Sequence, residues 1–448
     1  MRTSNLLKRI VSILVLIAML TVSYFVLSFA LVRTSYGESF IRDLDAIESS
    51  GKDIDLLFIG GSRVYRSFVP QIFKDSMGYD VVLNAGSSSQ PLVSTYYQLV
   101  ELAERFEPKN VVIGVSYGTM VDPADLQGRL IVLDRLSGVN RLNYIKAGFS
   151  SDEYMNFIPL YRYRSRYTDL TLNIKNKLKS LTNTDFVEVK DQEYYADMGF
   201  VYSEKSFEQG NIPMIHYSDA ADQQVLDENE KYLDMCISYC KDKGINVYMV
   251  TGMSSMMKLY NTDNYQHAVD YFINFASERD VVYHNLCYLK DRELTFTDSE
   301  MFDFNHLNGW GGEAVSRIYA EILSKTMAGE DTSEYFYADE AELKSDVQRV
   351  VAVNAETARE GTQLSLTLSS LHNESITPLY RIEYSKNDEE YSLLCDWTEE
   401  QKLELILPDE DKCYIKVYAK CKGVEDVDCI GDTVLPQTAA AFRVYKIK

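Results

Sequence analysis

Positive charge and metal-binding cysteine patterns are both scarce in this sequence. Lys and Arg number 45 against 67 Asp and Glu, which gives a formal net charge of -22 at pH 7. Non-specific binding to nucleic acid needs a basic surface, so this charge argues against a nucleic-acid partner. The seven cysteines lack the paired spacing of a zinc site. We therefore expect no nucleic acid, no metal and no cofactor.

Complete disulfide pairing is also excluded, because seven is an odd number of cysteines. Bridges among the last four, at positions 395, 413, 421 and 429, cannot be assigned from spacing alone. Internal repeats and low-complexity tracts are missing as well. Hydrophobic residues make up 46% of the 448 residues, which is enough for packed cores and indicates two to three domains.

A long apolar run is present at the N-terminus. Residues 10–32 carry no charge and are numerous enough to cross ~30 Å of hydrocarbon. Arg2, Lys8 and Arg9 precede the run, which by the positive-inside rule leaves the N-terminus in the cytoplasm. A cleaved signal peptide is the alternative, but no clear small-x-small cleavage site follows. We predict that residues 1–35 form a single-pass anchor in the cell membrane and that the rest is extracytoplasmic.

The pattern after the anchor is typical of a parallel sheet. Short apolar runs at 53–60, 80–84 and 110–115 alternate with helical periodicity at 69–77 and 91–106. Three such units in a row indicate a sheet covered by helices on both faces. The same alternation returns later and completes an α/β domain over 36–328, with helices at 223–243, 263–278 and 310–328 and strands at 246–251 and 281–286.

Two further regions differ in pattern. Residues 118–222 are irregular, rich in Tyr and Arg, and too long for a simple loop, so we interpret them as an insertion over the carboxyl edge of the sheet. Tyr163 and Arg164 in this insertion are candidate substrate contacts, by stacking on sugar rings and by holding anionic groups. Ordinary aromatic packing beneath the insertion explains them equally well.

The C-terminal region has a β pattern. An acidic linker is expected over 329–346. Residues 347–448 then show seven short alternating runs separated by turn residues. This is typical of an all-β sandwich of the immunoglobulin or fibronectin kind.

A serine follows the first strand at a glycine turn. Gly60, Gly61 and Ser62 interrupt an apolar run, and Pro70 suits the first turn of a helix. This arrangement presents a hydroxyl above the carboxyl end of a parallel sheet. The alternative is an ordinary turn in which the serine caps the helix.

A second motif lies just before the last helix of the α/β domain. Asp303 precedes His306 by three residues, so its carboxylate can curl back to the imidazole Nδ1. That contact fixes the tautomer and leaves Nε2 free to accept a hydroxyl proton. Serine needs such a base to become a nucleophile. A local loop hydrogen bond is the alternative reading of this motif on its own.

Together, these motifs resemble the SGNH (GDSL-type) hydrolase superfamily, and the resemblance covers about residues 53–325. It implies a flavodoxin-like three-layer α/β fold, with Ser62 as nucleophile, His306 as base and Asp303 as its orienting carboxylate. It also implies an oxyanion hole that includes the N–H groups of Ser62 and Gly86. The order of the motifs along the chain agrees with the family.

The third block departs from the family pattern. Where the family has G-x-N-D, this chain has Gly114-Val115-Ser116-Tyr117. Ser116 or Asn84 is then the expected side-chain donor, and loss of one such donor typically costs ~10²–10³ in rate. Such departures are similar to those of the membrane-anchored branch, which includes the D-alanyl-lipoteichoic acid transfer protein and alginate-type polysaccharide O-acetyltransferases.

The resemblance implies a serine acyltransferase or esterase that works through an acyl-serine. The implied substrates are acetyl or D-alanyl-like groups of a cell-envelope polysaccharide or teichoic acid, with a membrane-bound O-acyltransferase as a partner. Arg63, next to the nucleophile, is a candidate substrate contact, although such arginines are as often only solvated. The alternative function is a non-catalytic envelope binding or assembly protein on a degenerate scaffold.

Overall fold

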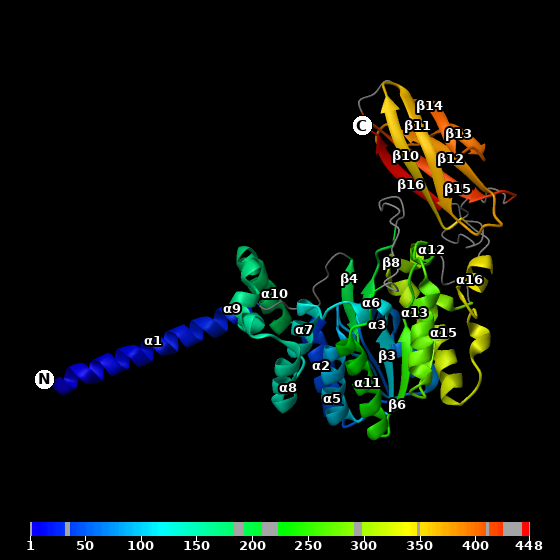
Figure 1. The fold of residues 1–448 in the computed structure, drawn as a ribbon. Coiled ribbons are helices and arrows are strands. Elements are labelled where there is room, and N and C mark those ends of the chain that lie inside the picture. Colours follow the sequence, from blue (N-terminus) through cyan, green and yellow to red (C-terminus); the bar gives the residue numbers. More distant parts are fainter. Residues whose placement is uncertain are drawn as a thin grey trace.

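The computed structural model describes residues 2–31, 36–182, 192–207, 223–290, 298–346, 350–408, 412–423 and 441–447. Three parts follow one another along the chain (Figure 1). A long helix, α1 (Arg2–Leu31), projects from an α/β body, and a separate β domain lies at the C-terminal end. The order of the three parts agrees with the pattern of the sequence.

The α/β body is built on a five-stranded parallel sheet. Its strands are arranged β2-β1-β3-β6-β7, and every neighbouring pair is parallel. In chain order this is 2-1-3-4-5, the flavodoxin-like arrangement. The predicted doubly covered parallel sheet is confirmed. The strands are β1 (Leu56–Ile59), β2 (Val82–Asn84), β3 (Asn110–Val115), β6 (Asn246–Thr251) and β7 (Val282–Asn285).

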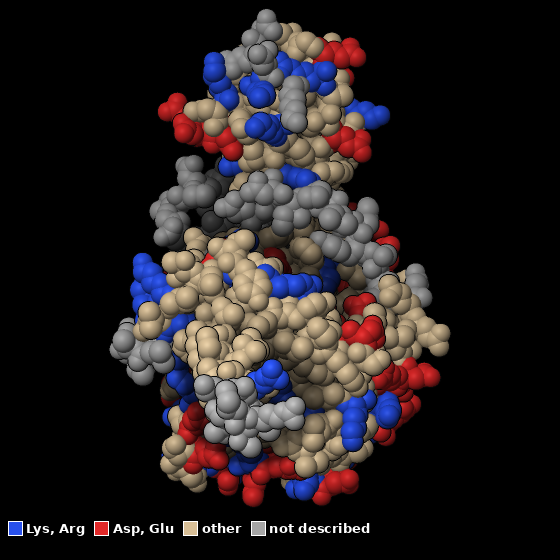
Figure 2. Space-filling model, turned by 90° about the vertical axis from the view of Figure 1, so that its left-hand side faces the viewer, with Lys and Arg blue, Asp and Glu red and all other residues tan. Residues whose placement is uncertain are grey.

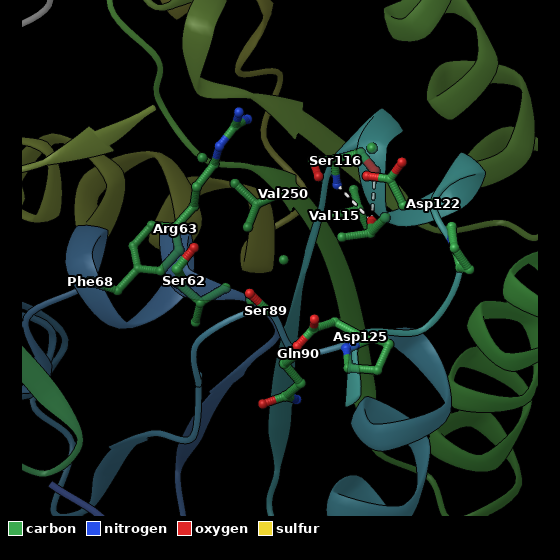
Figure 3. Close-up of a pocket in the computed structure, with 18 residues that line it drawn as sticks. Ser62, Arg63, Phe68, Ser89, Gln90, Val115, Ser116, Asp122, Asp125 and Val250 are labelled. Carbon is green, nitrogen blue, oxygen red and sulfur yellow. Dashed lines mark hydrogen bonds between the residues drawn. The ribbon is translucent and has the colours of Figure 1, made fainter. Parts of the chain in front are cut away.

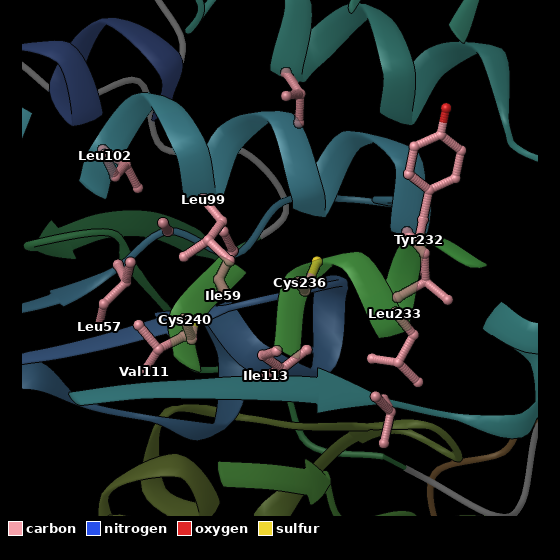
Figure 4. Close-up of a cluster of buried hydrophobic side chains, with 14 of the residues drawn as sticks. Leu57, Ile59, Leu99, Leu102, Val111, Ile113, Tyr232, Leu233, Cys236 and Cys240 are labelled. Atoms are coloured by element: carbon pink, nitrogen blue, oxygen red, sulfur yellow. The ribbon is translucent and has the colours of Figure 1, made fainter. Parts of the chain in front are cut away.

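Helices bury both faces of this sheet. Alternate strand residues point to opposite sides, so Leu57 and Ile59 join one apolar core while Leu56 and Phe58 join the other. Figure 4 shows the first core, where α5 and α11 cover the sheet. The first face carries α2 (Tyr36–Ser50), α5 (Leu92–Phe106) and α11 (Asp227–Asp242), and the second carries α4 (Pro70–Met77) and α15 (Gly309–Met327). Helix α13 (Tyr265–Ser277) also packs mainly on the first face, through Ala268, Phe272, Phe275 and Ala276.

Helix α1 meets the body only at its C-terminal end. Its segment Arg9–Leu31 is 23 residues long with a mean hydropathy of 2.7, and its apolar side chains are exposed up to the last turn. Ala30 and Leu31, in contrast, are buried against the body. This length and composition suit a membrane span or a signal sequence.

The described parts of the segment 118–222, residues 118–182 and 192–207, are more regular than the sequence suggests. Its helices are short and interrupted by 3-10 turns, which explains why no clear periodicity is visible. One part groups beside the end of α1, and a β-hairpin crosses the carboxyl end of the sheet. The elements are α6 (Tyr117–Val121), α7 (Leu126–Leu133), α8 (Gly138–Gly148), α9 (Pro159–Arg162), α10 (Leu170–Thr182), β4 (Glu193–Asp197) and β5 (Phe200–Ser203), with 3-10 helices at Ser151–Phe157 and Arg164–Asp169.

The segment 329–346, expected as a linker, packs against the α/β body. It contains a 3-10 turn (Ser333–Tyr335) and the helix α16 (Glu340–Asp346). Tyr337 and Leu343 are buried in the same core as α15, and the Tyr337 N–H donates to the Tyr288 carbonyl at 2.7 Å. Because the apolar side chains of this acidic segment are buried in the core of the α/β body, the segment belongs to that body.

The C-terminal domain consists of two antiparallel sheets around one core. Three strands are arranged β10-β11-β14 and four β13-β12-β15-β16. All seven strands coincide with the alternating runs in the sequence. Cys395 is a free thiol, and Cys429 lies outside the described residues. The strands are β10 (Ala352–Glu360), β11 (Gln363–Leu371), β12 (Pro378–Ser385), β13 (Ser392–Thr398), β14 (Lys402–Ile406), β15 (Cys413–Cys421) and β16 (Ala441–Ile447).

A buried histidine makes the body sensitive to acid. His284 is stacked on Phe336, and its Nδ1 lies 3.3 Å from the Tyr319 hydroxyl. Burial lowers the pKa of His284 to about 4. In the unfolded chain the imidazole binds a proton near pH 6.5, so the free energy of unfolding falls as the pH decreases from about 6.5 to 4.

We expect the free energy of unfolding of the wild type to fall by about 3 kcal/mol more than that of His284→Gln between these two pH values, measured by urea unfolding at each. An equal loss in both proteins would contradict the prediction.

Candidate active site

Ser62 is placed by a turn that only glycine can make. Strand β1 ends at Ile59, Gly60 has a φ of 147°, and α3 (Ser62–Ser67) begins at once. A Cβ at Gly60 would lie 2.7 Å from the Gly114 carbonyl oxygen of the neighbouring strand. Because the turn is so tight, Ser62 becomes the first helical residue, directly above the carboxyl end of the sheet.

The serine, the histidine and the aspartate form one chain of hydrogen bonds. Ser62 Oγ lies 2.7 Å from His306 Nε2, and His306 Nδ1 lies 2.9 Å from both carboxylate oxygens of Asp303. The last two residues belong to a small antiparallel pair, β8 (Met301–Asp303) and β9 (His306–Leu307), just before α15. The structure thus brings together a hydroxyl, an imidazole and a carboxylate, in the arrangement that acyl transfer to a serine would require.

The Asp303 carboxylate is held in its charged form. Burial alone would raise the pKa of Asp303, but hydrogen bonds from His306 and from the Asn305 N–H, together with the charge of Arg66, outweigh burial and lower it. The same carboxylate oxygen also accepts the His306 N–H at 3.0 Å. An ionised, triply hydrogen-bonded Asp303 therefore fixes the orientation of the imidazole and favours the tautomer with its proton on Nδ1.

A cavity of about 280 Å³ opens beside Ser62 (Figure 3). Ser62 and Arg63 form one wall, Ser116 and Asp122 lie across the cavity, and Ser89 lies between them at its base. The volume is at the lower end of the range of small-molecule sites. It has room for a short acyl group next to the nucleophile.

The two residues around the second strand do not act as the sequence predicts. The Gly86 N–H, expected in the oxyanion hole, donates to Asn84 Oδ1 at 3.1 Å. The Asn84 amide nitrogen donates in turn to the carbonyls of Val64 and Phe68, at 2.9 and 2.8 Å. Asn84 is fully buried and braces the helix that carries Ser62. Both expected donors are therefore occupied by hydrogen bonds within the fold.

Ser89 is the residue in this turn that sequence reasoning missed. Its φ is 49°, it lines the cavity, and its N–H has no hydrogen-bond partner among the described residues. Helix α7 packs closely on it, since a Cβ at Gly128 would lie 1.9 Å from the Ser89 carbonyl oxygen. A glycine at position 89 would have signalled the left-handed conformation, whereas a serine conceals it. Ser89 therefore adds an N–H without a partner among the described residues to the lining of the cavity that Ser62 shares.

Ser116 lines the cavity at the carboxyl end of β3. Its N–H donates to Thr119 Oγ1 at 3.2 Å, and the Thr119 hydroxyl donates back to the Ser116 carbonyl at 2.6 Å. This fixes the backbone at the start of α6. The Ser116 side chain lies across the cavity from Ser62, and its role as a side-chain donor to the oxyanion stays a prediction (Figure 3).

The three residues predicted to contact the substrate lie in two different places. Arg63 lines the cavity, where its guanidinium donates to Asn305 Oδ1 at 3.2 Å. Tyr163 and Arg164 do not line it. Arg164 stacks on Tyr161 at 4.2 Å and donates to the Tyr161 carbonyl at 2.8 Å, in the helical segment next to α1. The described insertion has two parts, and Tyr163 and Arg164 lie in the part next to α1, so the structure does not bring them together with Ser62. Their contact with a substrate stays a prediction.

Arg66 connects the active site to the hairpin above it. Its guanidinium is buried, lies 2.8 Å from the Glu193 carboxylate of β4, and covers the ring of Phe302 at 4.1 Å. Phe302 directly precedes Asp303. This ion pair therefore holds the hairpin against the strand that carries the orienting carboxylate.

Among the described residues, no group of three or more His, Cys, Asp or Glu side chains is placed to hold a metal ion. The arrangement at Ser62 is that of a nucleophile with its own base, which needs no metal to function.

No family model and no curated protein matches the chain. Among solved structures, a candidate acylhydrolase from Bacteroides fragilis matches over 64% of this chain and 96% of its own, with 9% identity and a TM-score of 0.31. A GDSL-like lipase from Bacteroides thetaiotaomicron matches over 66% and 99%, with 9% identity and a TM-score of 0.30. A gut microbial diltiazem-metabolizing enzyme matches over 79% and 70%, with 9% identity and a TM-score of 0.19. Similarity this low establishes no shared activity.

Proposed function

We propose that this protein is an SGNH (GDSL-type) serine acyl-transfer enzyme, an esterase or an O-acyltransferase. The observation that carries the proposal is the continuous hydrogen-bond chain from Ser62 through His306 to Asp303. It lies at the carboxyl end of a parallel sheet, beside a cavity of acyl-group size. Ser62, Asp303 and His306 have the spacing and the order of partners that nucleophilic catalysis requires.

The geometry supports a two-step reaction. His306 Nε2 takes the proton of the Ser62 hydroxyl as Oγ attacks the acyl carbonyl. The N–H groups of Ser62 and Ser89 stabilise the resulting oxyanion. His306 then returns the proton to the leaving oxygen, and an acyl-serine remains. In the second step His306 takes the proton of the incoming hydroxyl as its oxygen attacks the acyl-serine carbonyl. The bond to Ser62 Oγ then breaks, His306 returns the proton to Oγ, and the acylated acceptor leaves.

The acceptor decides whether the enzyme is an esterase or a transferase. Water gives hydrolysis, whereas a sugar hydroxyl gives acyl transfer. We favour transfer of an acetyl or D-alanyl-like group to a cell-envelope polysaccharide or teichoic acid. An extracytoplasmic enzyme anchored by α1 would lie beside a membrane-bound O-acyltransferase that supplies the acyl group.

One observation favours a second candidate, a non-catalytic envelope binding or assembly protein. Asn84 and Gly86 both form structural hydrogen bonds, so neither supplies the oxyanion hole. The C-terminal β domain would then be a binding module. Against this candidate, a scaffold without activity has no need to keep Ser62 and His306 at 2.7 Å.

Labelling by a serine-reactive fluorophosphonate tests the proposal. We expect the full chain in native membranes to gain one adduct, because His306 activates Ser62. Ser62→Ala and His306→Ala should gain none, while Ser277→Ala, a change at the exposed end of α13, should label as the wild type does. Intact mass spectrometry after extraction gives the readout. A folded wild-type chain without an adduct in these membranes would refute the enzyme and favour the binding protein.

A further inference from the structure

The helical segment beside α1 exposes an unusual amount of apolar surface. More than half of the exposed large apolar side chains described outside α1 lie between Val139 and Leu178. A soluble surface rarely gathers them in this way, and such patches mark contact with a partner or a membrane. The members of this apolar platform are Val139, Leu142, Tyr154, Met155, Ile158, Tyr161, Tyr167, Leu172, Ile174 and Leu178.

Helix α10 buries polar side chains and exposes apolar ones, the opposite of an ordinary surface helix. Its buried residues are Asn173 and Lys177, whereas Leu172 and Leu178 are each 56% exposed. The buried pair faces the end of α1: the Lys177 ammonium lies 5.3 Å from the centre of the Phe29 ring and pairs with Glu38. Water does not favour a helix with leucines outside and lysine inside. The outer face of α10 is suited to an apolar environment.

The position of α10 relative to α1 indicates what that environment is. The 23 residues of Arg9–Leu31 extend about 35 Å at 1.5 Å per residue, slightly more than a hydrocarbon core of ~30 Å. Leu31 therefore lies at the outer membrane surface when α1 spans. Arg166 donates to the Leu31 carbonyl, and both α9 and α10 contact α1. These helices cannot be far from the lipid headgroups.

The composition of the platform matches an interface with lipid. Three of its members are tyrosines, which concentrate at the boundary between headgroups and hydrocarbon. Lys175 and Lys179 lie beside Ile174 and Leu178 on α10, around a shallow apolar groove. A lysine near an anionic membrane strengthens association about fivefold. In Figure 2, which looks along α1 toward the body, acidic side chains gather along the lower edge of the α/β body.

We propose that the apolar platform on α8 to α10 lies in the outer headgroup layer of the membrane that α1 spans. Figure 1 shows these helices grouped around the end of α1, on the side from which it projects. The occupant is the lipid surface itself. This inference rests on the anchoring part of the proposed function and not on the chemistry at Ser62. The platform would fix the orientation of the α/β body on the membrane, which one helix alone cannot do.

Depth-dependent fluorescence quenching tests this placement. The full chain is reconstituted in phosphatidylcholine/phosphatidylglycerol vesicles with an environment-sensitive label on Leu178→Cys or Leu142→Cys. Ile406→Cys, 79% exposed on β14 of the C-terminal domain, is the matched control. We expect lipids spin-labelled near the headgroup to remove most of the fluorescence at positions 178 and 142 and little at 406. The unsubstituted chain, carried through the same labelling, corrects for the native cysteines.

Two results would overturn the proposal. Positions 178 and 142 could stay as unquenched as 406 while the chain resists alkaline extraction, which would show a spanning α1 with the platform in water. Alternatively, both labels could be shielded in native membranes but unquenched in lipid vesicles, which would assign the platform to a membrane protein. A chain released by alkaline extraction refutes the span and the platform together. Fluorophosphonate labelling is independent of all three results, so failure of the platform and failure of the enzyme remain distinguishable.

Discussion

An Asp303→Asn variant is expected to turn over an activated acetyl ester about 10⁴-fold more slowly than the wild type. Asp303 accepts hydrogen bonds from His306 Nδ1 and from the N–H groups of Asn305 and His306. An amide in its place donates as well as accepts, so the imidazole adopts the tautomer with its proton on Nε2. That nitrogen then faces Ser62 Oγ as a donor and cannot take its proton. The measurement is kcat/KM of the full chain in detergent.

The control for this prediction is a carboxylate in the same cavity without a role in orienting the base. Asp122 lines the cavity opposite Ser62. Asp122→Asn should change kcat far less than Asp303→Asn does, although KM can shift. If Asp303→Asn keeps wild-type kcat, Asp303 does not orient a catalytic base. If both variants lose activity equally, the loss reflects the charge of the cavity.

A Glu193→Ala variant is expected to lower the free energy of unfolding by about 3–5 kcal/mol. Glu193 is the ion-pair partner of Arg66, and the two side chains are only 16% and 6% exposed. Removing the carboxylate leaves a guanidinium buried without its counter-charge, which costs more than the ion pair itself contributes. Among the described residues, one guanidinium nitrogen of Arg66 is already buried without a hydrogen-bond partner, so loss of the Glu193 contact adds to an existing deficit. Urea unfolding of the full chain gives the measurement.

A double variant separates the ion pair from the packing around it. Arg66→Met with Glu193→Leu replaces both charges by apolar side chains of similar size, and such replacements are often neutral. We expect the double variant to be more stable than Glu193→Ala, with an interaction energy of about 0.5–3 kcal/mol in the double-mutant cycle. Equal stability of all variants would mean that the hairpin is held by other contacts. A stable double variant with reduced Ser62 labelling would assign the pair a role in positioning Asp303.

The sequence locates best those strands whose apolar run is bounded by polar or turn residues at both ends. Residues 110–115 and 246–251 match β3 and β6 to the residue. The first strand was predicted from residue 53 but begins at Leu56. The reason is that Ile54 donates its N–H to the Phe106 carbonyl, while the Asp55 carboxylate accepts the N–H groups of Asp80 and Val81. These contacts anchor the start of the strand from distant residues that a local pattern does not include.

The residues of the candidate site also differ in how well the sequence predicts them. Ser62, Asp303 and His306 carry local signals, namely a glycine turn and a three-residue spacing, and the structure brings them together. The oxyanion hole has no such signal, because a donor must have an N–H that nothing else has taken. Gly86 fails this condition only because Asn84 folds back onto it. Tyr163 and Arg164 show the same limit, since composition alone does not tell which part of an insertion reaches the serine.

The chemistry of the site is divided between distant parts of the chain. Ser62 and His306 are 244 residues apart in the sequence. Strand β1 directly precedes Ser62, and the other four strands of the sheet lie between the two residues. Contacts over such separations form late, since the intervening chain must first be ordered. Because a chain is synthesised from its N-terminus, the serine appears early but has no base until residue 306 has followed. The proposed activation of Ser62 would therefore report on folding, because it requires the α/β domain to be ordered as far as residue 306.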